Sequence, residues 1–153
     1  MNINKTEKNE IGIFSNMIAS GPVIIQKRDG KLKTLLVKHG DKPITELKWK
    51  FCGGRVVKDT GLRENAIRRA KEEIGIEVKI IKALEPLVLW NEKPEVDAGK
   101  PEAIILIHYL AEITAEPNGN RESEIMDWFD INDLPNDCAP NVKPVIDKYL
   151  ELE

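Results

Sequence analysis

The chain has 153 residues, of which 41% are hydrophobic and 32% charged, and its net charge is −3. This is the profile of a soluble globular protein with one core, and the negative charge gives no general attraction for nucleic acid or an anionic membrane. No apolar run approaches the roughly 18 residues that a membrane-spanning helix needs. We expect a single cytoplasmic domain over 1–153, with 1–10 loosely ordered.

The first predicted elements form a hairpin. Residues 17–27 are apolar and β-branched at their end, and the dipeptide Asp29-Gly30 is typical of a two-residue turn. Residues 33–40 are then predicted to be the return strand. Residues 49–52, WKFC, read as a short strand that leads into Gly53-Gly54.

A helix is predicted over 61–74, because apolar residues recur every four positions along it. Thr60 or Gly61 can serve as its N-cap, and Gly75 suits a left-handed stop after the last turn. The residues expected on the buried face are Leu62, Ala66, Ile67, Ala70 and Ile74.

The second half of the chain is predicted to hold strands at 76–90, 102–115 and 125–131. The first of these is expected to supply core side chains from Ile80, Ile81, Leu87, Val88 and Leu89. A closing helix is expected over about 140–151, with Val142, Val145, Ile146 and Tyr149 on one face. Several strands with one central and one terminal helix indicate a layered α/β fold.

The chemistry is concentrated between Gly53-Gly54 and the end of the first helix. Arg68 and Glu72 lie four residues apart, as do Arg69 and Glu73, so each pair shares a helix face. Mg²⁺ prefers oxygen ligands and commonly takes one or two carboxylates together with phosphate oxygens and water. Two adjacent glutamates beside a glycine carbonyl are therefore compatible with a magnesium site. The helix by itself, however, favours an ordinary amphipathic surface helix with Arg–Glu pairs.

The spacing of the whole segment GGRVVKDTGLRENAIRRAKEEIGI resembles the Nudix box. Six fixed positions of that box match this sequence at the family's spacing. They are the first glycine, the arginine, the pair of glutamates, and the final glycine with the aliphatic residue after it: Gly54, Arg68, Glu72, Glu73, Gly75 and Ile76. The resemblance implies a Nudix-type αβα sandwich with a mixed central sheet. It also implies a Mg²⁺-dependent hydrolase, with Mn²⁺ as an alternative cation, that acts on a small nucleotide substrate. Nudix relatives are often homodimers.

Two positions depart from the family's box. Thr60 stands in place of the first glutamate, and Arg69 in place of the glutamate after the arginine, which is usually a metal ligand in the family. A guanidinium has no acceptor and cannot bind Mg²⁺, but it can take the place of a second cation and pair with Glu73 or a substrate phosphate. We therefore expect one metal, bound by the Gly53 carbonyl, Glu72 and Glu73, with Arg68 orienting Glu72.

The opening GGRV and the preceding WKF also resemble the GDP-mannose mannosyl hydrolase branch of the family. That branch retains the first box glutamate and places a metal-binding glutamine and a catalytic histidine shortly before a tryptophan. Counting back from Trp128, these positions fall on Glu122 and Ser123, and serine alone is a poor base near neutral pH. Many pyrophosphate-cleaving relatives carry a glutamate in this loop, so Glu122 is predicted as a metal ligand or base, with Glu124 as a second candidate.

Substrate contacts are predicted at three basic residues. Arg69 and Arg55 can neutralise phosphate charge, although Arg55 also suits a solvent-facing strand position, and Lys50 can point into the cleft. His108, within an apolar strand, is interpreted as a buried core histidine. The three tryptophans can stack a base, but core or rim packing is the commoner role.

Three functions follow from these residues. The first is hydrolysis of the diphosphate in a nucleotide sugar, an ADP-ribose-like compound or a nucleoside triphosphate. The second is hydrolysis at the sugar carbon, as in the mannosyl hydrolase branch. The third is a nucleotide-binding module without catalysis, which the loss of acids at Thr60 and Arg69 favours.

Overall fold

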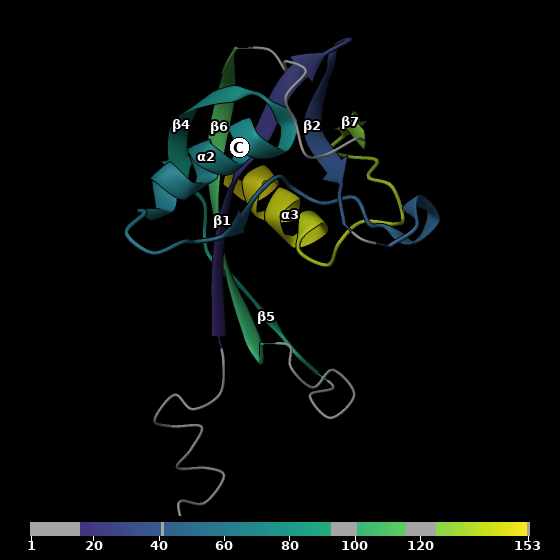
Figure 1. The fold of residues 1–153 in the computed structure, drawn as a ribbon. Helices are drawn as coiled ribbons and strands as arrows, with labels where there is room; N and C mark the ends of the chain where they lie inside the picture. The colour runs from purple at the N-terminus through teal and green to yellow at the C-terminus, as the bar shows by residue number, and fades with distance from the viewer. Residues whose placement is uncertain (1–15, 41, 93–100, 116–124, 153) are drawn as a thin grey trace, which may run out of the picture.

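The computed structural model describes residues 16–40, 42–92, 101–115 and 125–152. The expectation that residues 1–10 are loosely ordered lies outside this part of the chain. The elements, shown in Figure 1, are β1 Asn16–Arg28, β2 Lys31–Lys38, the short 3₁₀ helix η1 Ile44–Glu46, β3 Gly54–Arg55, α2 Leu62–Ile74, β4 Glu77–Ala83, β5 Leu87–Trp90, β6 Ala103–Ala115, β7 Ile125–Asp130 and α3 Val142–Leu152. No helix among these elements is long and apolar enough to cross a membrane.

Within the described residues, seven strands form one mixed sheet. The main order is β4-β6-β1-β2-β7, with β3 beside β1 and β5 beside β6. β1 and β6 run parallel, and all the other pairs are antiparallel. The predicted hairpin is present: Arg28 pairs with Lys31, and Asp29 and Gly30 both have positive φ, as a type I′ turn requires.

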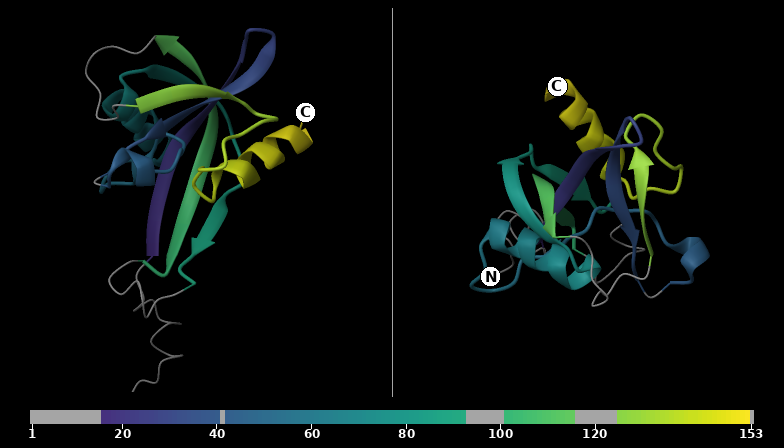
Figure 2. Two further views of the ribbon diagram at one scale, coloured as in Figure 1. Left: turned by 90° about the vertical axis from the view of Figure 1, so that its right-hand side faces the viewer. Right: turned by 90° about the horizontal axis from the view of Figure 1, so that it is seen from above.

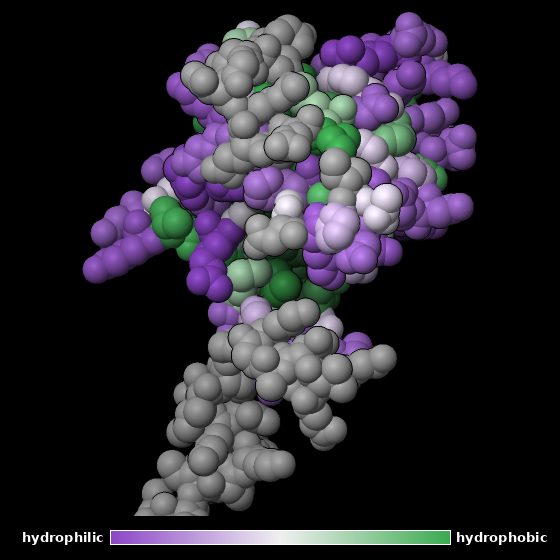
Figure 3. Space-filling model, turned by 45° about the vertical axis from the view of Figure 1, so that its right-hand side comes forward, coloured by the Kyte–Doolittle hydropathy of each residue, from purple (hydrophilic) through white to green (hydrophobic). Residues whose placement is uncertain are grey.

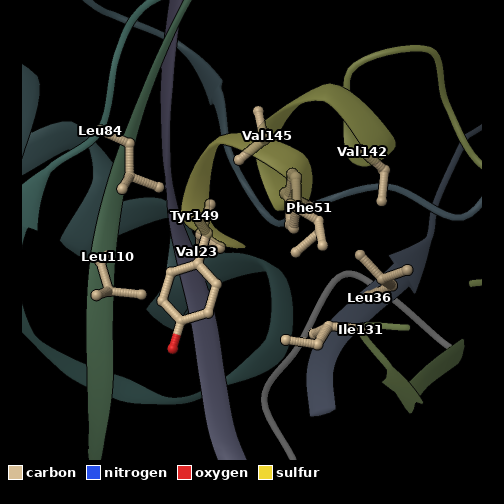
Figure 4. Packing of buried hydrophobic residues seen from close by; sticks show 10 residues of the cluster. Val23, Leu36, Phe51, Leu84, Leu110, Ile131, Val142, Val145 and Tyr149 are labelled. Atoms are coloured by element: carbon tan, nitrogen blue, oxygen red, sulfur yellow. The ribbon is translucent and has the colours of Figure 1, made fainter. Parts of the chain in front are cut away.

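The two α-helices cover opposite faces of the sheet, as the view from above in Figure 2 shows. Alternation along β1 separates the two cores: Val23 packs toward α3, and the next residue, Ile24, packs toward α2. Figure 4 shows Val142 and Val145 of α3 directed at this first core. The predicted αβα sandwich is confirmed.

The helix boundaries agree with the sequence to within two residues. Gly61 takes the N-cap position of α2, and Gly75 adopts the predicted left-handed conformation, where its N–H bonds to the Lys71 carbonyl. The apolar face of α2 is narrower than predicted, because Leu62 and Ile67 are 38% and 40% exposed. The small Ala66 and Ala70 are fully buried, which lets α2 approach the sheet closely.

Three other sequence expectations need correction. Segment 76–90 forms two strands, β4 and β5, rather than one. Within them Ile81 and Val88 do not join the core but are 53% and 41% exposed, because successive side chains of a strand face opposite sides of the sheet. Residues 49–52 form no continuous strand: Lys50 makes an isolated bridge to Val37, and Trp49 makes another to Cys138.

Candidate active site

The loop that carries the paired glycines is fixed by close backbone contacts. Hydrogen bonds of 2.8 and 3.0 Å between the backbones of Val37 and Lys50 tie its start to β2. The loop then crosses β1 at Gly21, where a Cβ atom would lie only 2.1 Å from the Cys52 carbonyl oxygen. Glycine is therefore required at position 21, because a side chain there would push the Gly53 backbone out of place.

Asn65 anchors α2 to this loop, a role that the sequence analysis missed. Its side chain is fully buried, and its Nδ2 donates to Ser20 Oγ at 2.9 Å and to the Gly54 carbonyl at 3.0 Å. Ser20 Oγ in turn donates to the Leu62 carbonyl. The available signal was an asparagine next to Ala66 on the buried side of a helix, where a polar side chain needs a partner.

Glu73 is the most deeply buried carboxylate of the box, with 1% of its surface exposed. Its Oε2 accepts hydrogen bonds from the Gly53 N–H at 3.0 Å and the Cys52 thiol at 3.3 Å. Burying an ionised carboxylate is costly unless it is paired and hydrogen-bonded. These donors, together with Arg69, supply that compensation and hold the carboxylate beside the glycine loop.

The guanidinium of Arg69 lies where three oxygens of the box converge. Its Nε approaches the Gly53 carbonyl at 3.4 Å, its Nη1 donates to Glu72 Oε2 at 2.9 Å, and its Nη2 approaches Glu73 Oε2 at 3.4 Å. The predicted pairing with Glu73 is present. These are oxygens of the kind that Mg²⁺ prefers, and they already gather around one positive charge. The donor set therefore fits a cation.

Arg68 Nη1 donates hydrogen bonds to both carboxylate oxygens of Glu72, at 2.9 and 2.8 Å. The hydrogen bond from Arg68, together with that from Arg69, lowers the pKa of Glu72 below its ordinary value. Arg68 Nη2 also donates to Asn65 Oδ1 at 2.6 Å. The predicted Arg68–Glu72 pair is thus connected to Asn65, the buried side chain that anchors α2 to the glycine loop.

Cys52 contributes a neutral donor to the site. Burial raises the pKa of its thiol well above the ordinary value, and the neighbouring Glu73 carboxylate raises it further. The sulfur therefore stays protonated, and its single S–H is shared between Glu73 Oε2 and the Arg69 carbonyl oxygen, each 3.3 Å from the sulfur.

The three basic residues predicted to bind substrate do not lie together. Arg69 is in the box, and Lys50 lines a pocket of about 320 Å³ that Gly53 and Gly54 also border. Arg55 is exposed and borders a different hollow, with Val56 and Leu62. The structure thus places Lys50 beside the glycine loop, whereas Arg55 is directed elsewhere.

Some of the remaining predicted residues lie outside the described part of the chain, and others can be placed. Glu122, Ser123 and Glu124 lie outside the described residues, so the predictions for them stay predictions. Among the described residues, no cluster of three or more His, Cys, Asp or Glu side chains is arranged to hold a metal ion. His108 is buried, as predicted, at 3% exposure.

The tryptophans occupy three different settings. Trp49 packs edge-on against Phe129 with ring centroids 4.8 Å apart, and Trp128 lies under the Arg28 guanidinium. Trp90 is 64% exposed. None of the three lines the pocket beside Gly53.

Residues 18–149 match the family model of the NUDIX domain. The chain belongs to this family. Membership identifies a hydrolase that acts on phosphorus-containing anhydrides, in agreement with the box. The chain has no significant match among curated proteins. These comparisons do not confirm the resemblance to the GDP-mannose mannosyl hydrolase branch.

Solved Nudix structures share the fold at low sequence identity. A MutT Nudix hydrolase from Burkholderia pseudomallei is 23% identical, with a TM-score of 0.69 over 87% of this chain and 97% of its own. A C. elegans Ap4A hydrolase is 22% identical, with a TM-score of 0.69 and coverages of 89% and 96%. An ADP-ribose pyrophosphatase from Streptococcus suis is 19% identical, with a TM-score of 0.58 and coverages of 88% and 87%.

Proposed function

We propose that the protein hydrolyses the diphosphate of a nucleoside diphosphate linked to another group, with one bound divalent cation, Mg²⁺ or Mn²⁺. The observation that carries this proposal is the convergence of the Gly53 carbonyl, Glu72 and Glu73 on a single positive charge. Similarity to proteins named for Ap4A and ADP-ribose supports the substrate class.

In this proposal the Gly53 carbonyl, Glu72 and Glu73 hold the cation together with substrate oxygens. When bound, the cation polarises the diphosphate and lowers the pKa of a bound water. Arg68 holds Glu72 in its orientation through the hydrogen bonds that its Nη1 donates to both carboxylate oxygens. The Gly53 N–H and the Cys52 thiol hold Glu73 Oε2, so the carboxylate keeps its position without reorganisation.

Arg69 has two roles in the proposed site. It supplies a permanent positive charge in place of a second metal, and its guanidinium can pair with a phosphate oxygen of the substrate. Lys50 adds a further positive charge beside the glycine loop. We assign water activation to Glu122, on the sequence argument alone.

Turnover with product identification tests the proposal. The protein is incubated with Mg²⁺ and nucleotide sugars, dinucleotides and nucleoside triphosphates. A nucleoside monophosphate product is expected from the nucleotide sugars and dinucleotides. Glu73→Gln should lower kcat by about 100-fold or more, whereas Glu77→Gln, an exposed glutamate just beyond the same helix, should leave it unchanged. Absence of turnover on every substrate, or full activity in Glu73→Gln, would refute the proposal.

One observation favours a binding module as the second candidate. Glu72 and Glu73, the two carboxylates proposed as metal ligands, are already paired with guanidinium groups, since Arg68 and Arg69 hold Glu72 and Arg69 also reaches Glu73. If this pairing excludes the cation, the protein binds nucleotides without cleaving them. Nucleotide binding by calorimetry without turnover in the same panel would establish this alternative.

A further inference from the structure

The guanidinium of Arg69 is held less tightly than the oxygens that surround it. Of the three contacts described above, only the one from Nη1 to Glu72 is short, at 2.9 Å, whereas those to the Gly53 carbonyl and to Glu73 are 3.4 Å. Hydrogen bonds from nitrogen to oxygen are usually about 2.7–3.2 Å long and weaken beyond that range. Among these contacts Arg69 therefore makes one good hydrogen bond and two weak ones.

The carboxylates around this guanidinium are held by other groups as well. Arg68 Nη1 donates to both carboxylate oxygens of Glu72. Glu73 Oε2 accepts hydrogen bonds from the Gly53 N–H and the Cys52 thiol. Both glutamates therefore keep their positions if the guanidinium moves away, so the guanidinium is the part of the site that can be exchanged for another positive charge.

A bound cation and the Arg69 guanidinium would compete for the same oxygens. The Arg69 side chain is 16% exposed and that of Glu73 is 1% exposed, so solvent screens charges there only weakly. Two positive charges a few ångströms apart repel each other strongly under such conditions. A cation held by the Gly53 carbonyl and the two glutamates thus takes over the oxygens that Arg69 contacts, and Arg69 gives them up.

The glycine at position 54 keeps the Arg69 side chain beside the loop. A Cβ atom on Gly54 would lie 2.8 Å from Arg69 Nε and 3.3 Å from Arg69 Cδ. Because Cδ already lies against Gly54, a guanidinium that leaves the carboxylates stays next to the glycine loop, which Lys50 also borders. Figure 3 shows mainly hydrophilic side chains on the left of the body, where α2 lies in Figure 1. This polar setting suits a charged phosphate.

We propose that Arg69 couples the binding of the cation to the binding of the diphosphate. Without a cation, the guanidinium pairs with Glu72 and Glu73. With a cation bound, it leaves them and donates to a phosphate oxygen of the substrate, since a guanidinium pairs with carboxylate and phosphate in the same planar geometry. The proposal rests on the proposed function for the cation and the diphosphate. Each of these two ligands then raises the affinity of the other by the same factor.

Binding of an uncleavable diphosphate tests the coupling. The dissociation constant of methylenediphosphonate is measured by calorimetry in EDTA and in saturating Mn²⁺, and the ratio of the two constants is the coupling factor. Mn²⁺ also binds the free diphosphonate, but this contribution is the same for every variant and cancels when the factors are compared. Arg69→Gln should lower the factor about 10-fold. Lys71→Gln removes the same charge on the exposed side of α2 and should leave the factor unchanged.

Two further measurements separate the coupling from the effect of a fixed charge. A charge that stayed in one place would contribute equally to diphosphonate binding with and without Mn²⁺, so its removal would leave the factor unchanged. Removal of a competing guanidinium should also tighten the binding of Mn²⁺ alone, as measured by the electron paramagnetic resonance of free Mn²⁺. Arg69→Lys keeps a charge that can reach a phosphate and should recover part of the factor. Thermal unfolding confirms that each variant is folded.

Failure of the coupling is distinguishable from failure of the proposed function. The coupling is overturned by an unchanged factor or unchanged Mn²⁺ affinity in Arg69→Gln, by no recovery in Arg69→Lys, or by no binding of the diphosphonate to the parent in Mn²⁺. If the substrate panel is hydrolysed in that case, the hydrolase assignment stands. A lowered factor in Arg69→Gln without hydrolysis of any substrate would support the coupling and overturn the proposed function instead.

Discussion

Arg69 lies one helical turn before Glu73, and its Nη2 is 3.4 Å from the Glu73 Oε2. The same guanidinium reaches Glu72 and the Gly53 carbonyl. A residue that cannot bind a metal thus stands among the three oxygens that we propose as ligands of the cation. The arrangement has a measurable consequence for the number of cations that the site binds.

Arg69→Glu should raise the number of Mn²⁺ ions bound from one to two, because it removes a fixed positive charge and adds a carboxylate ligand. Titration calorimetry or the electron paramagnetic resonance signal of free Mn²⁺ measures this stoichiometry. Lys71→Glu makes the same charge change on the exposed side of α2 and should leave it at one. An unchanged stoichiometry in Arg69→Glu would mean that Arg69 does not take the place of a cation.

Asn65→Ala should lower the free energy of unfolding by about 1–3 kcal/mol, because Ser20 Oγ and the Gly54 carbonyl lose a buried donor. Urea denaturation measures the change. Asn136→Ala, at an exposed position, should lie within about 0.5 kcal/mol of the parent. Ser20→Ala combined with Asn65→Ala should cost less than the sum of the single changes, since the two share one hydrogen bond. Strict additivity would show that the two side chains act independently.

His108 should make stability fall as the pH decreases from about 6.5 to about 4. The folded state keeps the ring neutral down to a pKa of about 4, whereas the unfolded chain takes up the proton near the ordinary value of about 6.5. Protons therefore bind preferentially to the unfolded state in this window, at a cost of about 3 kcal/mol across it. His108→Gln should lose this component, as measured by urea denaturation at several pH values. An identical pH profile in the variant would contradict the burial of a neutral ring.

Ile146→Ala should destabilise the protein by about 2–5 kcal/mol, because the side chain is fully buried between α3 and the sheet. Leu152→Ala removes a similar side chain that is 62% exposed at the end of the same helix, and it should change stability by no more than about 0.5 kcal/mol. Thermal or urea unfolding compares the two. Similar losses in both variants would show that α3 does not pack as described.

Much of the fold follows from local patterns. Asp29-Gly30 specifies its turn because both residues tolerate positive φ, and the four-residue spacing that includes Ala66 and Ala70 specifies α2. Ile81 and Val88 were misassigned because a short apolar run does not show which of its residues face the core. Which residues face the core is decided by how the strand pairs with its neighbours in the sheet.

The box was recognisable because its spacing follows the helix: residues four apart share a face wherever the helix packs. The sequence by itself therefore determined the Arg68–Glu72 and Arg69–Glu73 pairs and the left-handed stop at Gly75. Only the tertiary structure decided that Asn65 reaches Ser20 and Gly54, that Glu73 is buried under the Gly53 N–H, and that Asn141 meets His108. Each of these contacts joins elements far apart along the chain, and their partners are selected by the packing of helices on the sheet.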